Sequence, residues 1–460
     1  MLKIFCFFIY LSRTNEDSRN PAWDVMGYQL ERENLIKPKK ERPLRKGIIE
    51  ILYESDTTLV NSLTEKGLKV IEDGKLNAYK IKCDVVIVGS GCRGGAAAAV
   101  LAKSGQKVVV VEKGHYFVVE DYSSLEGPSL NQLYESGGVL STLDQKCMKL
   151  AGSTVDGGSA VNWPASIKAP TSLLKKWALD HKILFFRSSD YVSAMDTVCK
   201  RIGVAERCSE EGFHIQVLRK VYKNIGLKVE YVPWNCSEDH SCSSYCYGCE
   251  AGDKRGTDII WLVDAIDNGV VILTGCETER FILKKNHFVR IRKKKCVGLI
   301  ASIYLPGKDF QGGLITSLHK ISSHESESDV QTVIEAPTLR PASFGVLLAW
   351  VSGHDAKKIL LKYLRTAYLF ALVKDQGSGE VKQEGRISYK LDPSDKENLK
   401  MSIRRALYIL VAAGATEVGI HKSDGQRMMC KGVKEKKLEK FLDTLITCGG
   451  PKSNGELWNI

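Results

Sequence analysis

The sequence has no run of about 18 or more apolar residues, so none of its segments predicts a transmembrane helix. The apolar stretch from Ile4 to Leu11 is not followed by a small-residue cleavage site, which argues against a signal peptide and favours an exposed tail or a weak interfacial anchor. A basic groove interleaved with aromatic residues is also missing, and no nucleic-acid-binding module is recognised. We therefore expect no nucleic-acid partner.

Basic residues are in excess. The 66 Lys and Arg residues against 54 Asp and Glu give the 460-residue chain a formal charge of +12. Two dense runs, Lys37 to Gly47 and Lys284 to Lys295, are explained either by a solvated surface or by a binding surface for anionic lipid headgroups. The 14 cysteines are spread over the whole length, which is typical of reduced thiols in a cytosol-facing protein rather than of a secreted disulfide framework.

A glycine-rich turn between two predicted strands is the strongest local signal. Asp84 to Val88 is a short β-branched run of the kind found in buried parallel strands, and a second strand, Lys107 to Val111, ends in an acidic residue. The intervening G-x-G-x-x-G spacing, followed by an Ala-rich helix, predicts that a dinucleotide pyrophosphate binds at the helix N-terminus and its ribose at the acid. The predicted contacts are Val88, Gly89, Ser90, Gly91, Cys92, Arg93, Gly94, Gly95 and Glu112.

An acid at this position disfavours NADP but leaves both NAD and FAD open. The second glycine-rich segment, AGSTVDGGSAVNWP from Ala151 to Pro164, separates them. Together with GCEAGDKRGTDIIWLVDAIDNGVVILTGC and AAGATEVGIHKSDGQ, it resembles the glucose–methanol–choline (GMC) family of FAD-dependent oxidoreductases, and within it the plant long-chain fatty alcohol oxidases. The resemblance implies FAD as the cofactor, with Gly152 and Asn162 in the segment that runs along the flavin. Asp156 departs from the family, which usually has glycine there; the alternative for the segment is a plain surface loop.

Two further segments bear on ligands. Asn268 to Leu283 predicts a buried strand, a turn and another strand, and the resemblance implies that the backbone at Thr278 touches the adenine.

The cysteines at 236, 242, 246 and 249 have the spacing C-x5-C-x3-C-x2-C with His240 between them. Only the last pair has the two-residue gap usual in zinc sites, so we expect structural cysteines and no metal.

The predicted fold is α/β, a Rossmann-like FAD-binding domain plus an α+β substrate domain with an antiparallel sheet. Ser394 and Glu397 predict a capping box at the start of a helix that Gly414 ends. The predicted organisation is an N-terminal extension (1–79), the first part of the FAD-binding domain (80–165), a cap or substrate region with the cysteine cluster (166–257), the returning FAD-binding segment (258–304) and the substrate domain (305–460).

The resemblance implies oxidation of a long-chain fatty alcohol by molecular oxygen at a membrane surface; a cytoplasmic location is the alternative. It also implies a histidine base in a C-terminal segment, yet no histidine follows His421. We therefore expect the substrate domain to be C-terminally incomplete, no catalytic residue to be assignable, and activity to be impaired. The competing hypotheses are a non-catalytic flavin-binding remnant or interaction protein, and an NAD-dependent dehydrogenase, which would leave the second glycine segment unexplained.

Overall fold

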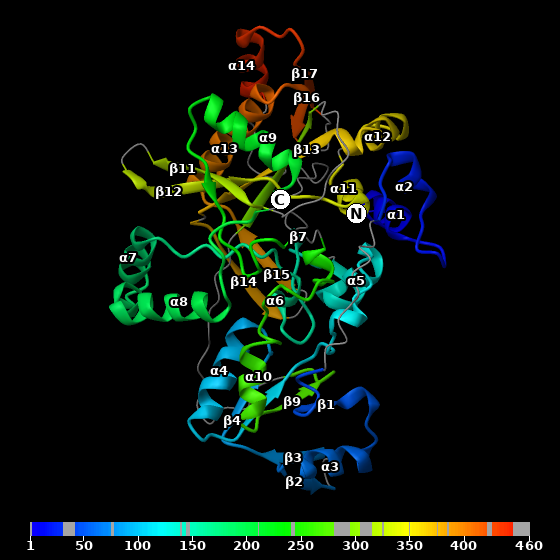
Figure 1. Cartoon of the computed structure of the whole chain (residues 1–460), viewed down its shortest axis with the longest axis vertical. Coiled ribbons are helices and arrows are strands. Elements are labelled where there is room, and N and C mark those ends of the chain that lie inside the picture. The colour runs from blue at the N-terminus through cyan, green and yellow to red at the C-terminus, as the bar shows by residue number, and fades with distance from the viewer. Residues whose placement is uncertain are drawn as a thin grey trace.

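The structure is a computed structural model of the full chain. The structure describes residues 2–30, 42–74, 78–138, 140–143, 148–209, 211–240, 244–279, 295–303, 315–323, 326–348, 350–374, 376–383, 386–420 and 426–444. Two sheets organise these residues, and they lie at opposite ends of the long axis of the molecule, a parallel sheet below and a larger antiparallel sheet above (Figure 1).

The parallel sheet has the strand order β1-β9-β5-β4. One face is covered by helices α4 and α10, whose alanines and leucines pack on β5 and β9, and the other face is partly covered by α3. The predicted strand–helix–strand unit is therefore present, as β4, α4 and β5. The elements of the whole parallel region are β1 (Ile48–Glu50), α3 (Asp56–Glu65), β4 (Val85–Val88), α4 (Cys92–Lys103), β5 (Val108–Val111), α10 (Trp261–Asp267) and β9 (Val271–Thr274).

The prediction that β4 is a buried strand is wrong. β4 forms the edge of the described sheet, and the side chains of Val86 and Val88 are 52% and 46% exposed. β9 lies inside the same sheet and all four of its residues are buried. A run of β-branched residues thus identified both strands, but it did not distinguish an edge strand from a central one.

The second sheet is antiparallel, in the order β17-β16-β10-β13-β12-β11-β8. Helices α9 and α13 pack on it and form the largest apolar core of the chain. These elements are α9 (Phe213–Asn224), β8 (Glu230–Tyr231), β10 (Lys295–Ile303), β11 (Ser317–Ser323), β12 (Ser326–Glu335), β13 (Thr366–Val373), α13 (Pro393–Ala412), β16 (Ala415–Ile420) and β17 (Arg427–Met429).

Helix α13 begins two residues earlier than its predicted capping box. Asp392 is the N-cap and Asp395 reaches back to it, so Ser394 and Glu397 do not form the box. Pro393 is the first helical residue, a position where its missing N–H costs nothing. The predicted end is confirmed, since Gly414 follows the helix with φ +88°.

Short elements surround the two sheets. Helices α7 and α8 project to the left in Figure 1, and their connection is held by contacts of Phe186 with Trp177 and Tyr191. The remaining elements are β2 (Lys69–Asp73), β3 (Ala78–Lys82), α5 (Glu126–Leu133), β6 (Leu140–Ser141), β7 (Met148–Lys149), α6 (Gly158–Val161), α7 (Thr171–Asp180), α8 (Ser189–Arg201), β14 (Ser378–Gln383), β15 (Arg386–Lys390) and α14 (Glu435–Thr444).

The apolar N-terminal stretch forms helix α1 (Leu2–Ser12), which contacts α2 (Pro21–Met26) and α11 (Pro341–Leu347); α12 (Gly353–Leu360) lies nearby (Figure 1). Leu11 is fully buried in this cluster, and its carbonyl accepts a hydrogen bond from the Trp23 indole at 2.8 Å. Among the described residues, no helix combines the length and the hydropathy needed to cross a bilayer.

The two sheets assign two strands differently from the predicted domain boundaries. β1 pairs with β9 in the parallel sheet, although it falls within the predicted extension 1–79. β10 pairs with β13 and β16 in the antiparallel sheet, although it falls within the predicted returning segment 258–304. The other boundaries stay predictions.

Candidate functional site

The turn between β4 and α4 needs glycine at defined positions. Gly89 has φ +86°, a conformation that residues with a Cβ rarely adopt. A Cβ on Gly94 would overlap the carbonyl oxygen of Gly89, so only glycine lets the helix pack this closely on the turn. Gly91 is the N-cap of α4, and the next two residues, Cys92 and Arg93, are exposed on its first turn. The helix therefore presents its N-terminal N–H groups at an open surface, as anion binding requires.

Glu112 lies directly after β5, beside this turn. Its carboxylate is 6% exposed and accepts hydrogen bonds from the backbone N–H and the hydroxyl of Ser90 at 2.8 and 2.7 Å, and from the N–H of Gly114 at 2.8 Å. A carboxylate has about four lone-pair sites. The three bonds orient the group and leave acceptor capacity for a ribose hydroxyl.

The second glycine-rich segment packs against the first. A Cβ on Gly157 would lie 3.1 Å from the Cα of Gly91, and a Cβ on Gly152 would meet the carbonyl carbon of Gly157 at 2.7 Å. Asp156 has φ +77° although it is not glycine. Its N–H donates to the Ser90 hydroxyl at 3.2 Å, so the two glycine segments share one hydrogen-bond network with Glu112.

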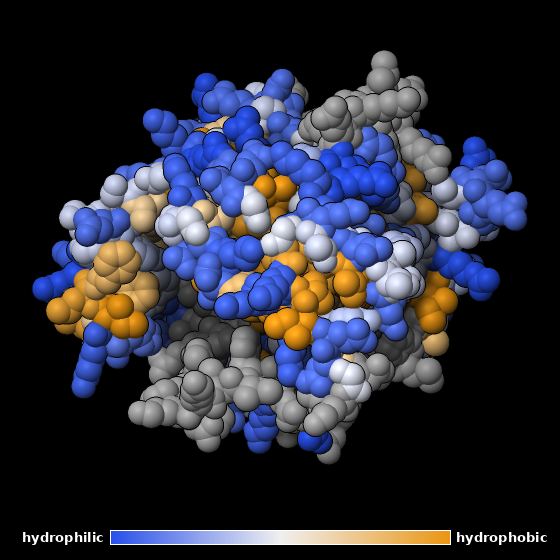
Figure 2. Space-filling model, turned by 90° about the horizontal axis from the view of Figure 1, so that it is seen from below, coloured by the Kyte–Doolittle hydropathy of each residue, from blue (hydrophilic) through white to orange (hydrophobic). Residues whose placement is uncertain are grey.

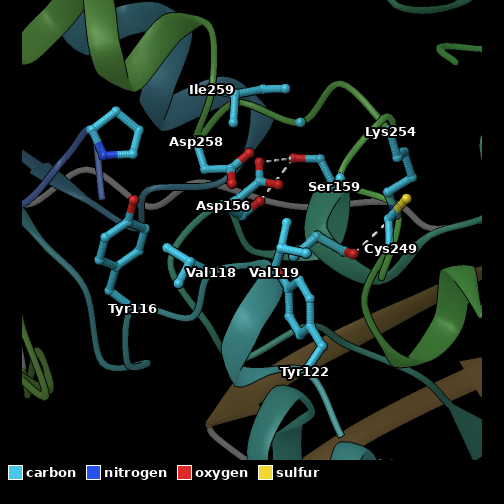
Figure 3. Close-up of a pocket in the computed structure, with 14 residues that line it drawn as sticks. Tyr116, Val118, Val119, Tyr122, Asp156, Ser159, Cys249, Lys254, Asp258 and Ile259 are labelled. Carbon is cyan, nitrogen blue, oxygen red and sulfur yellow. Dashed lines mark hydrogen bonds between the residues drawn. The ribbon is translucent and has the colours of Figure 1, made fainter. Parts of the chain in front are cut away.

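A buried carboxyl group, a partly buried one and a buried ammonium group stand beside this segment. The carboxyl groups of Asp156 and Asp258 face each other (Figure 3), and the Asp156 carboxylate accepts hydrogen bonds from Ser159 and from Thr257. Burial raises the pKa of Asp156, and burial together with the Asp156 charge raises the pKa of Asp258 to about 8. Asp258 is therefore mostly protonated at neutral pH.

Lys254 is the cation of the group. Its ammonium donates to the backbone carbonyls of Ala160 and Asn162 at 2.9 and 2.7 Å, and to the Asn162 side-chain oxygen at 3.3 Å. Burial lowers the pKa of Lys254, and the neighbouring Asp156 opposes that shift. Lys254 thus holds the end of the second glycine segment, where the predicted flavin contact Asn162 lies exposed.

These groups line a cavity of about 200 Å³. Its wall combines residues from the stretch before β1, the loop after β5, the second glycine segment and the loop before α10: Pro43, Tyr116, Val118, Val119, Tyr122, Asp156, Ser159, Ala160, Cys249, Gly252, Lys254, Gly256, Asp258 and Ile259. An open helix N-terminus, a glycine turn that excludes a Cβ and an oriented acceptor at Glu112 fit the adenosine diphosphate part of FAD. Asp156 and Asp258 are carboxyl groups of this wall that, when ionised, add negative charge near an anionic ligand.

The structure brings most of the predicted site residues together. Gly89 to Gly95 and Glu112 meet at the β4–α4 turn, and Gly152 and Asn162 flank the neighbouring segment. Thr278 follows β9 in a stretch whose Cys276 N–H donates to the Glu112 carbonyl at 3.0 Å. The cofactor contacts themselves stay predictions.

Sequence reasoning assigned no role to Lys254, Thr257 or Asp258. All three lie in GDKRGTD, a cluster of polar residues directly before an apolar helix. Such a cluster at the start of a buried helix was the available signal, because polar groups there must be either solvated or paired.

No histidine is among the residues that line the cavity in the described part of the chain. His115 lies beside the second glycine segment, where its backbone pairs with Thr154. His214 and His319 lie in α9 and β11 of the antiparallel region. His287, His324 and His421 fall outside the described residues.

The cysteine cluster is compact. Cys236 and Cys249 are buried near His240, and Cys246 is partly buried nearby, where burial raises the pKa of its thiol to about 11. Cys242 lies outside the described residues. The spacing alone did not reveal that Asp253 joins this group, because it comes from the next turn of the chain.

Comparison with known proteins agrees with this geometry. The GMC oxidoreductase profile matches residues 130–309, and the FAD binding domain profile matches residues 84–124. The chain is 45% identical to the long-chain-alcohol oxidase FAO3 of Arabidopsis thaliana, over 99% of this chain and 69% of that protein. It is 43% identical to FAO1 of the same plant, over 100% and 69%.

A solved structure supports the fold. The crystal structure of pyridoxine 4-oxidase from "Mesorbium loti" superposes with a TM-score of 0.50 at 12% identity, over 80% of this chain and 86% of that one. This likeness shows a shared fold and nothing more. Identity above 40% along the whole chain shows common descent with the long-chain-alcohol oxidases. The chain belongs to the GMC oxidoreductase family.

Proposed function

We propose that the chain is an FAD-dependent oxidase of long-chain fatty alcohols that uses molecular oxygen as the electron acceptor. The observation that carries the proposal is the joining of the β4–α4 turn, Glu112 and the second glycine segment through Ser90. The relatives named long-chain-alcohol oxidases support the substrate class. FAD, when bound, supplies the two-electron acceptor for alcohol oxidation.

The residues of this chain bind and orient. Glu112 and the N-terminus of α4 hold the nucleotide end, and Lys254 fixes the carbonyls at the end of the second glycine segment. No histidine lines the described cavity, and no described residue is assigned as the base that would take the alcohol proton. Because general-base catalysis contributes about 10²–10⁴-fold to rate, we expect slow turnover from the residues described.

The test is anaerobic reduction of the FAD-loaded chain by hexadecanol, followed as loss of flavin absorbance, with Arabidopsis FAO3 run in parallel. We expect hexadecanol to bleach the flavin about 10²–10⁴-fold more slowly than in FAO3. A flavin that dithionite reduces but hexadecanol never does would overturn the proposal. It would favour a flavin-binding protein without oxidase activity.

Association with a membrane surface is a second, separate proposal. It is supported by Ile9 and Tyr10 of α1, which are 56% and 62% exposed, and by Arg13 next to them. Co-sedimentation with vesicles containing phosphatidylserine, compared with neutral vesicles, tests it. Binding that is lost in Ile9→Ser is expected, whereas full recovery of the protein in the supernatant would contradict it and favour a cytoplasmic location.

A further inference from the structure

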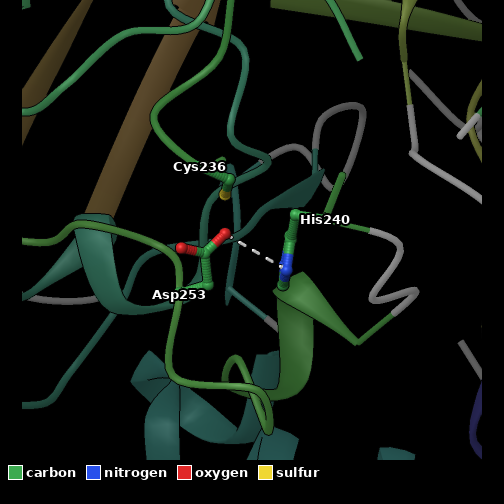
Figure 4. Close-up of side chains that lie close together, drawn as sticks. All are labelled: Cys236, His240 and Asp253. Atoms are coloured by element: carbon green, nitrogen blue, oxygen red, sulfur yellow. Dashed lines mark ion pairs between the residues drawn. The ribbon is translucent and has the colours of Figure 1, made fainter. Parts of the chain in front are cut away.

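A mixed set of metal-binding side chains lies next to the cofactor cavity. Cys236, His240 and Asp253 each offer one ligand atom, and these three atoms lie within 4.8 Å of one another (Figure 4). The thiol of Cys236 is fully buried, and the side chains of His240 and Asp253 are 4% and 27% exposed. The site is therefore enclosed on the protein side and has an opening to solvent at Asp253.

The distances fit a tetrahedral cation. His240 Nδ1 lies 3.3 Å from Asp253 Oδ2. Zinc bonds of about 2.0–2.1 Å to nitrogen and oxygen, at tetrahedral angles, place two such ligand atoms about 3.3–3.4 Å apart. The Cys236 sulfur lies within 4.8 Å of both atoms, so a shift of at most about 1.2 Å would bring it to the sulfur–nitrogen separation of about 3.6 Å expected around zinc.

The surrounding groups orient the ligands as they do at metal centres. The backbone N–H and hydroxyl of Ser237 donate to Asp253 at 2.8 and 2.7 Å and fix its carboxylate. On the far side of the imidazole, His240 Nε2 contacts Cys249 Sγ at 3.6 Å. With the Nε2–H donated to this sulfur, the Nδ1 lone pair faces Asp253 Oδ2, the side on which a metal would lie between the two groups. A ligating histidine ordinarily has its other ring N–H engaged in a hydrogen bond.

The chemistry of the set favours zinc. One thiolate, one imidazole and one carboxylate are ligands that zinc accepts, with water in the fourth position. As the metal–sulfur bond forms, the thiol proton passes to water.

We propose that Cys236, His240 and Asp253 form a zinc site, with Cys249 as the hydrogen-bond partner of His240. The site would fix Asp253 next to Lys254, and so the loop that supports the second glycine segment. It does not depend on the proposed oxidase activity.

The experiment measures metal content in the purified full-length chain after dialysis against dilute zinc. We expect about one zinc per chain, which Cys236→Ser and Asp253→Asn each reduce at least about fivefold. Asp253→Asn changes a partly exposed side chain and tests the site where Cys236→Ser fails to fold. Cys430→Ser, in the antiparallel region, is the matched control and should keep its zinc.

Cobalt substitution separates the ligand from its partner. The cobalt form should show a thiolate-to-metal band in the near ultraviolet, lost in Cys236→Ser and retained in Cys249→Ser. A band that disappears in Cys249→Ser but survives in Cys236→Ser would overturn the ligand assignment. Folded protein that takes up neither metal, or a disulfide at Cys236 found by peptide mass spectrometry of the purified chain, would overturn the site itself.

Discussion

Strands β4 and β13 are both built almost wholly from apolar residues, yet only β13 is buried along its length. β13 is bonded on both sides, to β10 and β12, and α13 packs on it. β4 is bonded only to β5 in the described sheet. Seen from below, hydrophobic residues gather in the middle of the face formed by the parallel-sheet end, and again at the left, the side of α7 and α8 (Figure 2).

This difference in burial reflects a difference in the interactions that stabilise the two regions. The antiparallel region is stabilised mainly by an apolar core around α13. The parallel region has a smaller core, an open edge, buried ionisable groups at Asp156 and Lys254, and a partly buried one at Asp258. Substitutions in the first region should therefore affect stability without affecting ligand binding, whereas substitutions in the second region can affect both.

The largest expected effect is on stability. Leu407 of α13 is fully buried, so Leu407→Ala should lower the free energy of unfolding by about 2–5 kcal/mol in urea denaturation. The next residue, Tyr408, is 42% exposed, and Tyr408→Ala should change it by about 0.5 kcal/mol or less. FAD affinity should be the same in both variants while they are folded. Equal losses from the two substitutions would contradict the assigned core.

The next effect is on binding. Gly91→Val should weaken FAD binding about 100-fold or more in flavin fluorescence titration, because a side chain blocks the hydrogen bonds between backbone and phosphate. The fold should survive, since a Cβ at Gly91 meets only ordinary contacts at 3.6 and 3.7 Å. Gly74→Val, in the turn between β2 and β3, is the control. If Gly91→Val binds FAD normally, the loop assignment is wrong.

These two sites were predictable from sequence for different reasons. The glycine turn has a fixed spacing because one backbone geometry must approach a phosphate, and the α13 core has a helical repeat of apolar residues. The helix start at Asp392 and the edge position of β4 were missed. The first depends on which side chain bonds the N-cap residue, and the second on which strands pair with β4. The cavity wall at Asp258 and the Asp253–His240 pair join residues from separate turns, and no local pattern encodes such a contact.

A third effect depends on pH. Asp258 is neutral in the folded protein below its pKa of about 8, and its ionisation above that value adds negative charge beside a diphosphate site. FAD affinity should therefore fall about tenfold between pH 6 and 9, and Asp258→Asn should flatten the profile. Asp156, Lys254 and Tyr122 face the same group, so a residual slope is expected.

The same shift predicts a stability change of defined sign. Because the folded pKa of Asp258 is raised, its contribution to stability is complete below about pH 4 and is lost as the pH rises to about 8. Glu335 of β12, where burial raises the pKa to about 7, shares this sign in the other region. Glu335→Gln should alter the pH dependence of unfolding but not that of FAD binding. An effect of Glu335→Gln on FAD binding would contradict the conclusion that the antiparallel region does not influence the FAD site.

The smallest effect tests the open edge directly. Val86→Thr keeps the β-branched shape and changes a half-exposed side chain of β4, so it should alter the free energy of unfolding by about 0.5 kcal/mol or less. Val110→Thr makes the same change in β5, where the side chain is fully buried, and should cost about 1–3 kcal/mol because a hydroxyl enters an apolar core. Both are measured by urea denaturation at one pH. A loss for Val86→Thr as large as that for Val110→Thr would mean that the face of β4 is covered in solution, and the contrast between β4 and β13 would then disappear.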